Sequence, residues 1–200
     1  MKKQKLRRLT MAALCGAVSF VLMYFSFSVP VLSPFAEFDF SALPELIGGF
    51  ILGPLGAIEI IVVKIGLKLL FKGSSSLLTG ELINFVLSIA YVLPALIYYR
   101  RHKTKKGAVI GLALGTVVSV VVSIFANIYL TFPLYIKLYG MNWEGIIEIC
   151  SAVNPWIKSI PTMVAFSIVP FNLISRAVTS LITLLVYKKL SVPIKKLVQE

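Results

Sequence analysis

Long apolar runs alternate along the chain with short polar, proline-bearing or basic segments. The runs predict helices over residues of about 8–29, 41–54, 55–72, 81–99, 108–130 and 161–187. Most of these segments approach the roughly 20 apolar residues that a helix needs to cross a bilayer. The pattern therefore predicts an all-α membrane protein, a six-transmembrane-helix bundle that forms a single domain over residues 1–200.

The second and third of these helices are predicted to be a short pair. The apolar run from Ser41 to Phe71 would be about 46 Å long as one helix, well beyond the roughly 30 Å of the hydrocarbon core. The dipeptide Gly53-Pro54 interrupts the run, and such a dipeptide favours a turn. We therefore expect two short helices that meet at this point.

Two polar segments, residues 30–40 and 131–160, are predicted to be outer loops. Both contain prolines and acidic residues, and the second favours a short interfacial helix around Trp143–Ile149. Pro170 predicts a kink in the last helix. The first apolar run follows a basic segment, as in a signal peptide, but it is longer than a typical h-region and no A-x-A-like site follows it. We interpret it as the first membrane helix.

Composition and charge agree with a membrane protein. Hydrophobic residues make up 58% of the chain and charged residues 14%, against about 45–50% and 25% in soluble domains. The net charge of +12 is typical of nucleic-acid-binding proteins. However, fourteen of the twenty Lys and Arg residues lie in three clusters, at residues 2–8, 100–106 and 188–196, beside apolar runs. This pattern indicates cytoplasmic segments, so both termini are predicted to be cytoplasmic and nucleic acid is not expected as a partner.

Several polar side chains interrupt the apolar runs, where a charged group costs about 2.5–3.5 kcal/mol. Lys64, Lys68 and Lys72 form one stripe on a helix. Lys68 and Lys72 are expected to snorkel to the outer interface, and Lys64 to face a cavity or an ion-pair partner. The others are Glu59, Asn84, Asn127, Asn172, Ser175 and Arg176.

Three of these residues, Asn84, Asn127 and Asn172, lie at similar depth on three different predicted helices. This arrangement predicts a pocket open to the outside. Hydrogen bonds between the helices are the alternative explanation for the three amides.

Motifs of hydrolytic enzymes and nucleotide-binding proteins are missing from the sequence. It contains no HExxH, no G-x-S-x-G and no Walker A loop, and Cys15 and Cys150 form no metal or disulfide framework. An intramembrane enzyme would also need a convergent His, Ser or carboxylate pair, which the pattern does not predict. Small residues on the first helix, namely Ala12, Ala13, Gly16 and Ala17, form overlapping small-xxx-small pairs that allow close helix approach.

Several segments together resemble a known family. They are the small-residue first helix, FDFSALPELIGGFILGP at residues 38–54, the pair Val63-Lys64, and VPFNLIS at residues 169–175. The chain resembles the substrate-binding S components of energy-coupling factor (ECF) vitamin transporters, and most of all the riboflavin-specific ones. Its most specific matches are DFSALP at residues 39–44 and PFNLI at residues 170–174.

The resemblance implies a multi-pass protein of the bacterial cytoplasmic membrane, with no enzymatic activity, no cofactor and no metal site. It implies a high-affinity pocket near the outer face for riboflavin or a related flavin such as FMN, capped by the loop after the first helix. It also implies docking on a membrane-embedded coupling subunit driven by two cytoplasmic ATPases. An S component for a different vitamin or an anionic small molecule is the alternative.

Carried onto this sequence, the resemblance gives two sets of candidate residues. The pocket candidates are Glu37, Asp39, Phe40, Lys64, Asn84, Asn127, Tyr135, Asn172 and Ser175. The docking candidates are Ala12, Ala13, Gly16 and Ala17. The family often has a lysine directly after the PFNLI-type segment, where this chain has Ser175 followed by Arg176. Together with the lysine stripe, this difference favours a phosphorylated flavin or another anionic vitamin.

Overall fold

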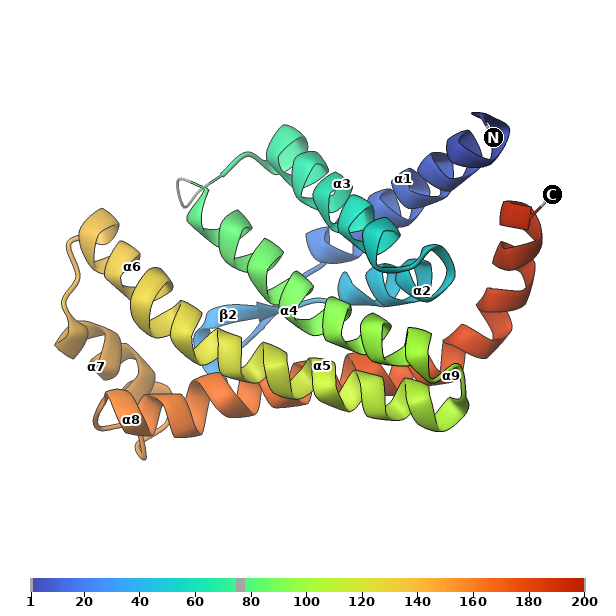
Figure 1. Ribbon diagram of the computed structural model, residues 1–200. Helices are drawn as coiled ribbons and strands as arrows, with labels where there is room; N and C mark the ends of the chain where they lie inside the picture. Colours follow the sequence, from blue (N-terminus) through green and yellow to red (C-terminus); the bar gives the residue numbers. More distant parts are fainter. Residues whose placement is uncertain (1, 75–77, 200) are drawn as a thin grey trace.

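The computed structural model describes residues 2–74 and 78–199, and these are mostly helical (Figure 1). Helices and strands follow one another as α1 (Lys2–Tyr24), β1 (Phe27–Val29), β2 (Ser33–Phe38), α2 (Ala42–Leu52), α3 (Pro54–Lys72), α4 (Thr79–Arg101), α5 (Lys105–Ala126), the π-helix η1 (Asn127–Thr131), α6 (Phe132–Tyr139), α7 (Trp143–Val153), α8 (Ile160–Met163), the π-helix η2 (Val164–Ile168) and α9 (Val169–Gln199).

Four segments within the described residues are long and apolar enough to cross a membrane, against the six predicted. They are Gln4–Tyr24, Thr79–Arg101, Lys105–Tyr139 and Ile160–Tyr187. The difference lies in α2 and α3. With 11 residues, α2 is about 16 Å long and shorter than the hydrocarbon core. With 19 residues, α3 is long enough, but it carries Glu59 and the three stripe lysines.

The turn between α2 and α3 lies at the predicted dipeptide. Gly53 adopts φ +86°, a conformation that favours glycine, and its N–H donates to the Gly49 carbonyl oxygen at 2.8 Å. Pro54 begins α3, where a proline costs nothing because the first N–H groups of a helix have no partner within it.

The segment after α1 differs from the prediction. The first helix ends at Tyr24 and not near residue 29, because Phe27–Val29 pairs with Ser33–Phe38 as an antiparallel hairpin. The segment 30–40 is therefore partly β structure and not only a loop. Cross-strand hydrogen bonds satisfy backbone groups that an irregular loop would leave to water.

The segment 131–160 is also more ordered than predicted. The helix α5 continues through η1 into α6, which ends at Tyr139, and the expected interfacial helix is α7 (Figure 1). Pro133 has no N–H to donate, and the π-helix just before it lets the helix continue. A second π-helix, η2, precedes Pro170, the proline for which a kink was predicted.

Two apolar clusters hold the helices together. One joins α2, α3, α4 and α5 around Leu46, Tyr91, Leu96 and Leu112, all almost fully buried. The other joins α6, α7 and the segment before α9 around Phe132, Ile146, Cys150 and Met163, among others. The first cluster holds α2, α3, α4 and α5 together, and the second supports the wall of the cavity described next.

Candidate functional site

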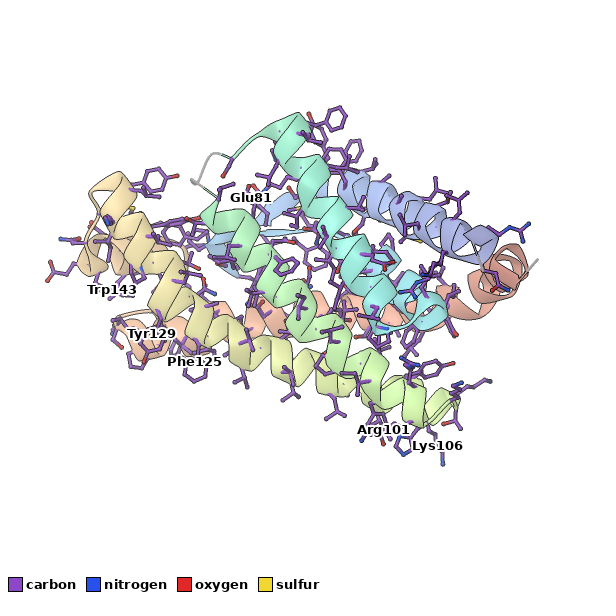
Figure 2. All side chains as sticks on the ribbon, turned by 45° about the horizontal axis from the view of Figure 1, so that its top comes forward. Glu81, Arg101, Lys106, Phe125, Tyr129 and Trp143 are labelled. Carbon is purple, nitrogen blue, oxygen red and sulfur yellow. The ribbon has the colours of Figure 1, made fainter. Side chains whose placement is uncertain are left out.

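A cavity of about 430 Å³ lies where the end of α3 and the start of α4 meet the β-hairpin, η1, α6 and α9. Its volume falls within the roughly 300–1,000 Å³ of small-molecule sites. Figure 2 places Glu81, which lines the cavity, toward the same end of the bundle as Trp143 and away from Arg101 and Lys106. The cavity thus lies far from the basic hinge between α4 and α5.

Seven of the nine predicted pocket residues line this cavity. They are Glu37, Asp39, Asn84, Asn127, Tyr135, Asn172 and Ser175. The other two do not line it. Phe40 packs edge-on against Phe38, and Lys64 lies fully buried beneath the cavity.

The asparagine amides divide into one donor and two acceptors. The Nδ2 groups of Asn127 and Asn172 donate to the backbone oxygens of Ser123 and Ile168, at 2.8 and 2.9 Å. Because a carbonyl oxygen only accepts, both amides must turn N–H toward their own helix, which leaves Oδ1 to accept from a ligand. Asn84 is reversed. Its Oδ1 accepts from Lys64 Nζ at 2.7 Å, so its N–H groups remain available to the cavity.

A buried ion pair supports the floor of the cavity. Lys64 Nζ lies 2.5 Å from Glu45 Oε1, and both side chains are 0% exposed. The ammonium also approaches the hydroxyl oxygens of Ser88 and Ser41, at 3.0 and 3.4 Å. Because Ser41, Ser88 and Asn84 all line the cavity, this one lysine joins three floor residues. Of the two sequence alternatives for Lys64, the structure has the ion pair.

Further cations face the cavity. Lys68 pairs with Glu81 at 2.7 Å with a side chain only 19% exposed, so the prediction that it snorkels is wrong. Lys72 is exposed and lies 5.7 Å from the centre of the Tyr24 ring. Arg176 lies 5.0 Å from the centre of the Tyr91 ring, and its buried Nε has no hydrogen-bond partner among the described residues.

Our candidate set had omitted these side chains, although their chemistry matters here. Lys68, Lys72, Glu81 and Arg176 all line the cavity. The stripe of lysines in the sequence was a signal for the first two. No sequence pattern had indicated Glu81, which comes beside Lys68 only because α3 and α4 pack together.

The two acids of the hairpin segment have different roles. Glu37 accepts a short hydrogen bond of 2.5 Å from Ser26, which ties β2 to the residues before β1. One oxygen of Asp39 accepts from the Ser41 N–H at 2.7 Å, an Asx turn that leads into α2. Aromatic walls come from Phe35 and Tyr135, whose ring centres lie 6.0 Å apart.

The predicted docking residues separate into two faces of α1. Ala12 and Gly16 are buried against the bundle, and a Cβ added to Gly16 would lie 2.6 Å from Val63 Cγ1. These two residues therefore serve packing between α1 and α3 and are not available to another protein, contrary to our prediction. Ala13 is exposed and Ala17 is half-buried.

The family follows from comparison with known proteins. The model of the ECF transporter substrate-specific component matches residues 7–187. The chain belongs to this family. As an S component it is part of a transporter and not an enzyme, and with its membrane-spanning helices it is a multi-pass protein of the bacterial cell membrane.

Individual relatives are similar to this chain over nearly its whole length. The riboflavin transporter RibU of Staphylococcus aureus is 28% identical over 97% of this chain and 95% of its own. RibU of Streptococcus thermophilus is 31% identical over 96% and 86%, and the riboflavin transporter FmnP of Bacillus subtilis is 26% identical over 93% of each. A solved S component of a bacterial ECF transporter superposes with a TM-score of 0.73, at 28% identity over 96% of this chain and 99% of its own.

Proposed function

We propose that this S component binds riboflavin in the outer cavity and delivers it to an ECF module for import. The observation that carries the proposal is the cavity itself, which combines aromatic walls with one amide donor and two amide acceptors. Riboflavin has a flat ring system with carbonyl acceptors and a sugar-alcohol chain with several hydroxyls, and such a site matches both parts. The names of the three relatives support the same ligand.

In the membrane, we propose six spanning helices with both termini in the cytoplasm. On this view the short pair α2 and α3 crosses the bilayer. The ion pair with Glu45 of α2 lowers the cost of burying the Lys64 charge of α3. The basic hinge lies away from the cavity end in Figure 2, which supports a cavity that opens to the outside.

For delivery, we propose that the exposed face of α1 docks on the membrane-embedded coupling subunit, which two cytoplasmic ATPases drive. This face carries the exposed Ala13 together with Leu14, Val18 and Val21, whose side chains are about half exposed. Small side chains on an apolar face allow the close helix approach that membrane interfaces need.

The decisive experiment is a riboflavin titration of the chain purified in detergent, followed by flavin fluorescence and absorbance. Asn127→Ala and Asn172→Ala should each weaken binding by roughly 1–3 kcal/mol, because each removes an amide acceptor that bound riboflavin would bury. Asn154→Ala is the matched control, since this asparagine bonds the Trp156 N–H outside the cavity. A chain that ignores riboflavin, or unchanged affinity in both cavity variants, would contradict the proposal.

A phosphorylated flavin is the second candidate. Arg176 favours it, because its charge has no acidic partner among the described residues, whereas Lys68 is already paired. Competition between FMN and riboflavin tests this candidate. Arg176→Gln should weaken FMN more than riboflavin if the phosphate meets the guanidinium, and equal weakening would exclude that contact.

A further inference from the structure

A second cavity lies at the other end of the bundle, about 290 Å³ in volume. The end of α2, the end of α4 and the α9 residue Tyr187 line it, together with Lys103 from the basic hinge. Figure 2 shows the neighbouring hinge residues Arg101 and Lys106 at this end, away from Glu81. The outer ligand cavity shares no lining residue with it.

Three aromatic rings form a rigid wall of this inner cavity. The Phe50 ring centre lies 4.7 Å from that of Tyr99 and 5.0 Å from that of Tyr187. The two tyrosine hydroxyl oxygens are 3.4 Å apart. The wall is therefore apolar except for these two neighbouring hydroxyl groups, each of which can donate one hydrogen bond.

The charge of the inner cavity is positive. Arg100 and Lys103 line it, no acidic residue does, and neither cation has an ion-pair partner among the described residues. Two helix C-termini, those of α2 and α4, oppose this charge with about half a negative charge each. The two side chains carry two full positive charges, so about one net positive charge remains.

We propose that the inner cavity binds a phosphate-bearing anion. Basic pockets between membrane helices on the cytoplasmic side are suited to anionic lipid headgroups, and free phosphate offers the same charged oxygens. The planar guanidinium of Arg100 suits two phosphate oxygens at once, and Lys103 adds a point charge. The aromatic wall suits the glycerol and upper acyl region of a lipid.

The test uses the full chain in detergent, titrated with phosphatidylglycerol, with phosphatidylcholine, and with inorganic phosphate, and read by native mass spectrometry and thermal unfolding. The variant is Arg100→Gln with Lys103→Gln. The matched control is Lys105→Gln with Lys106→Gln, which removes two exposed charges from the same end outside the cavity. Riboflavin binding at the outer cavity, measured in both variants, reports that the bundle is folded.

Phosphatidylglycerol should bind more tightly than phosphatidylcholine, and the cavity variant should lose roughly 30-fold in affinity, about fivefold for each charge. The control variant should keep its affinity. If inorganic phosphate competes, the site takes the free anion as well. If it does not compete, the source is the lipid headgroup. Equal losses in both variants, or no preference for phosphatidylglycerol, would overturn the proposal.

Discussion

Lys64→Met probes the buried pair beneath the ligand cavity. The substitution keeps an unbranched apolar side chain but leaves the carboxylate of Glu45 with no cation, in a place where both side chains are 0% exposed. Removing one member of a buried ion pair typically costs about 3–5 kcal/mol. Glu45 Oε2 has no hydrogen-bond partner among the described residues, and Oε1 would keep only the long hydrogen bond of 3.4 Å from the Ser88 hydroxyl, which offsets little of a full charge. We therefore expect the full cost.

The double variant Lys64→Met with Glu45→Leu separates charge from geometry. Replacing both members with apolar groups is often neutral for stability, so the double variant should regain most of the lost stability. Asn84 would still lack the lysine that holds its Oδ1 at 2.7 Å. Its amide could then rotate, and riboflavin binding should stay weaker by roughly 0.5–1.5 kcal/mol, the net value of one hydrogen bond.

The assay is thermal unfolding in detergent together with riboflavin titration, with Lys137→Met as control because that lysine is exposed and does not line the cavity. On the scale of soluble domains of this size, 3–5 kcal/mol corresponds to roughly 6–20 °C in Tm. The reasoning about the pair fails if Lys64→Met unfolds no earlier than the control. The orienting role of Lys64 fails if the double variant binds riboflavin like the unmodified chain.

Three more predictions concern α1 and Cys150, which belongs to the apolar cluster around Phe132 and Ile146. Ala13→Trp should leave riboflavin binding unchanged and abolish uptake in cells that hold the ECF module, and normal uptake would refute the docking face. Gly16→Leu should lower the stability of the fold by about 1–3 kcal/mol through overpacking against Val63, with Ala13→Leu as an exposed control that stays near zero. Burial raises the pKa of the Cys150 thiol to about 11, so the thiol is neutral at pH 7 to 9. In the folded chain, maleimide labelling of Cys150 should be slow and rise with pH, whereas rapid labelling at pH 7 without unfolding would contradict its burial.

Asparagine positions were predictable, but their chemical roles were not. The sequence places Asn84, Asn127 and Asn172 at similar depth, and all three line the cavity. Which of them donates and which accepts depends on partners from the fold. For Asn84 that partner is Lys64, which is distant in the sequence and belongs to another helix.

Apolar runs and basic clusters were sufficient to identify a membrane protein with helices at nearly the observed positions, because the bilayer requires about 20 apolar residues for each span. The break at Gly53-Pro54 was likewise local, since it depends on glycine and proline backbone preferences. The hairpin at residues 27–38 was missed because strand formation depends on the pairing partner across the hairpin, and the apolar run of the first helix continues into Phe27–Val29.

Tertiary packing decided how each helix is rotated about its axis, which periodicity alone leaves open. That rotation buries Ala12 and Gly16 while exposing Ala13, and it turns Lys68 inward to Glu81 instead of outward. A membrane helix is apolar on most sides, so its sequence determines that it crosses the bilayer. Only its neighbours determine which side chains meet at a site.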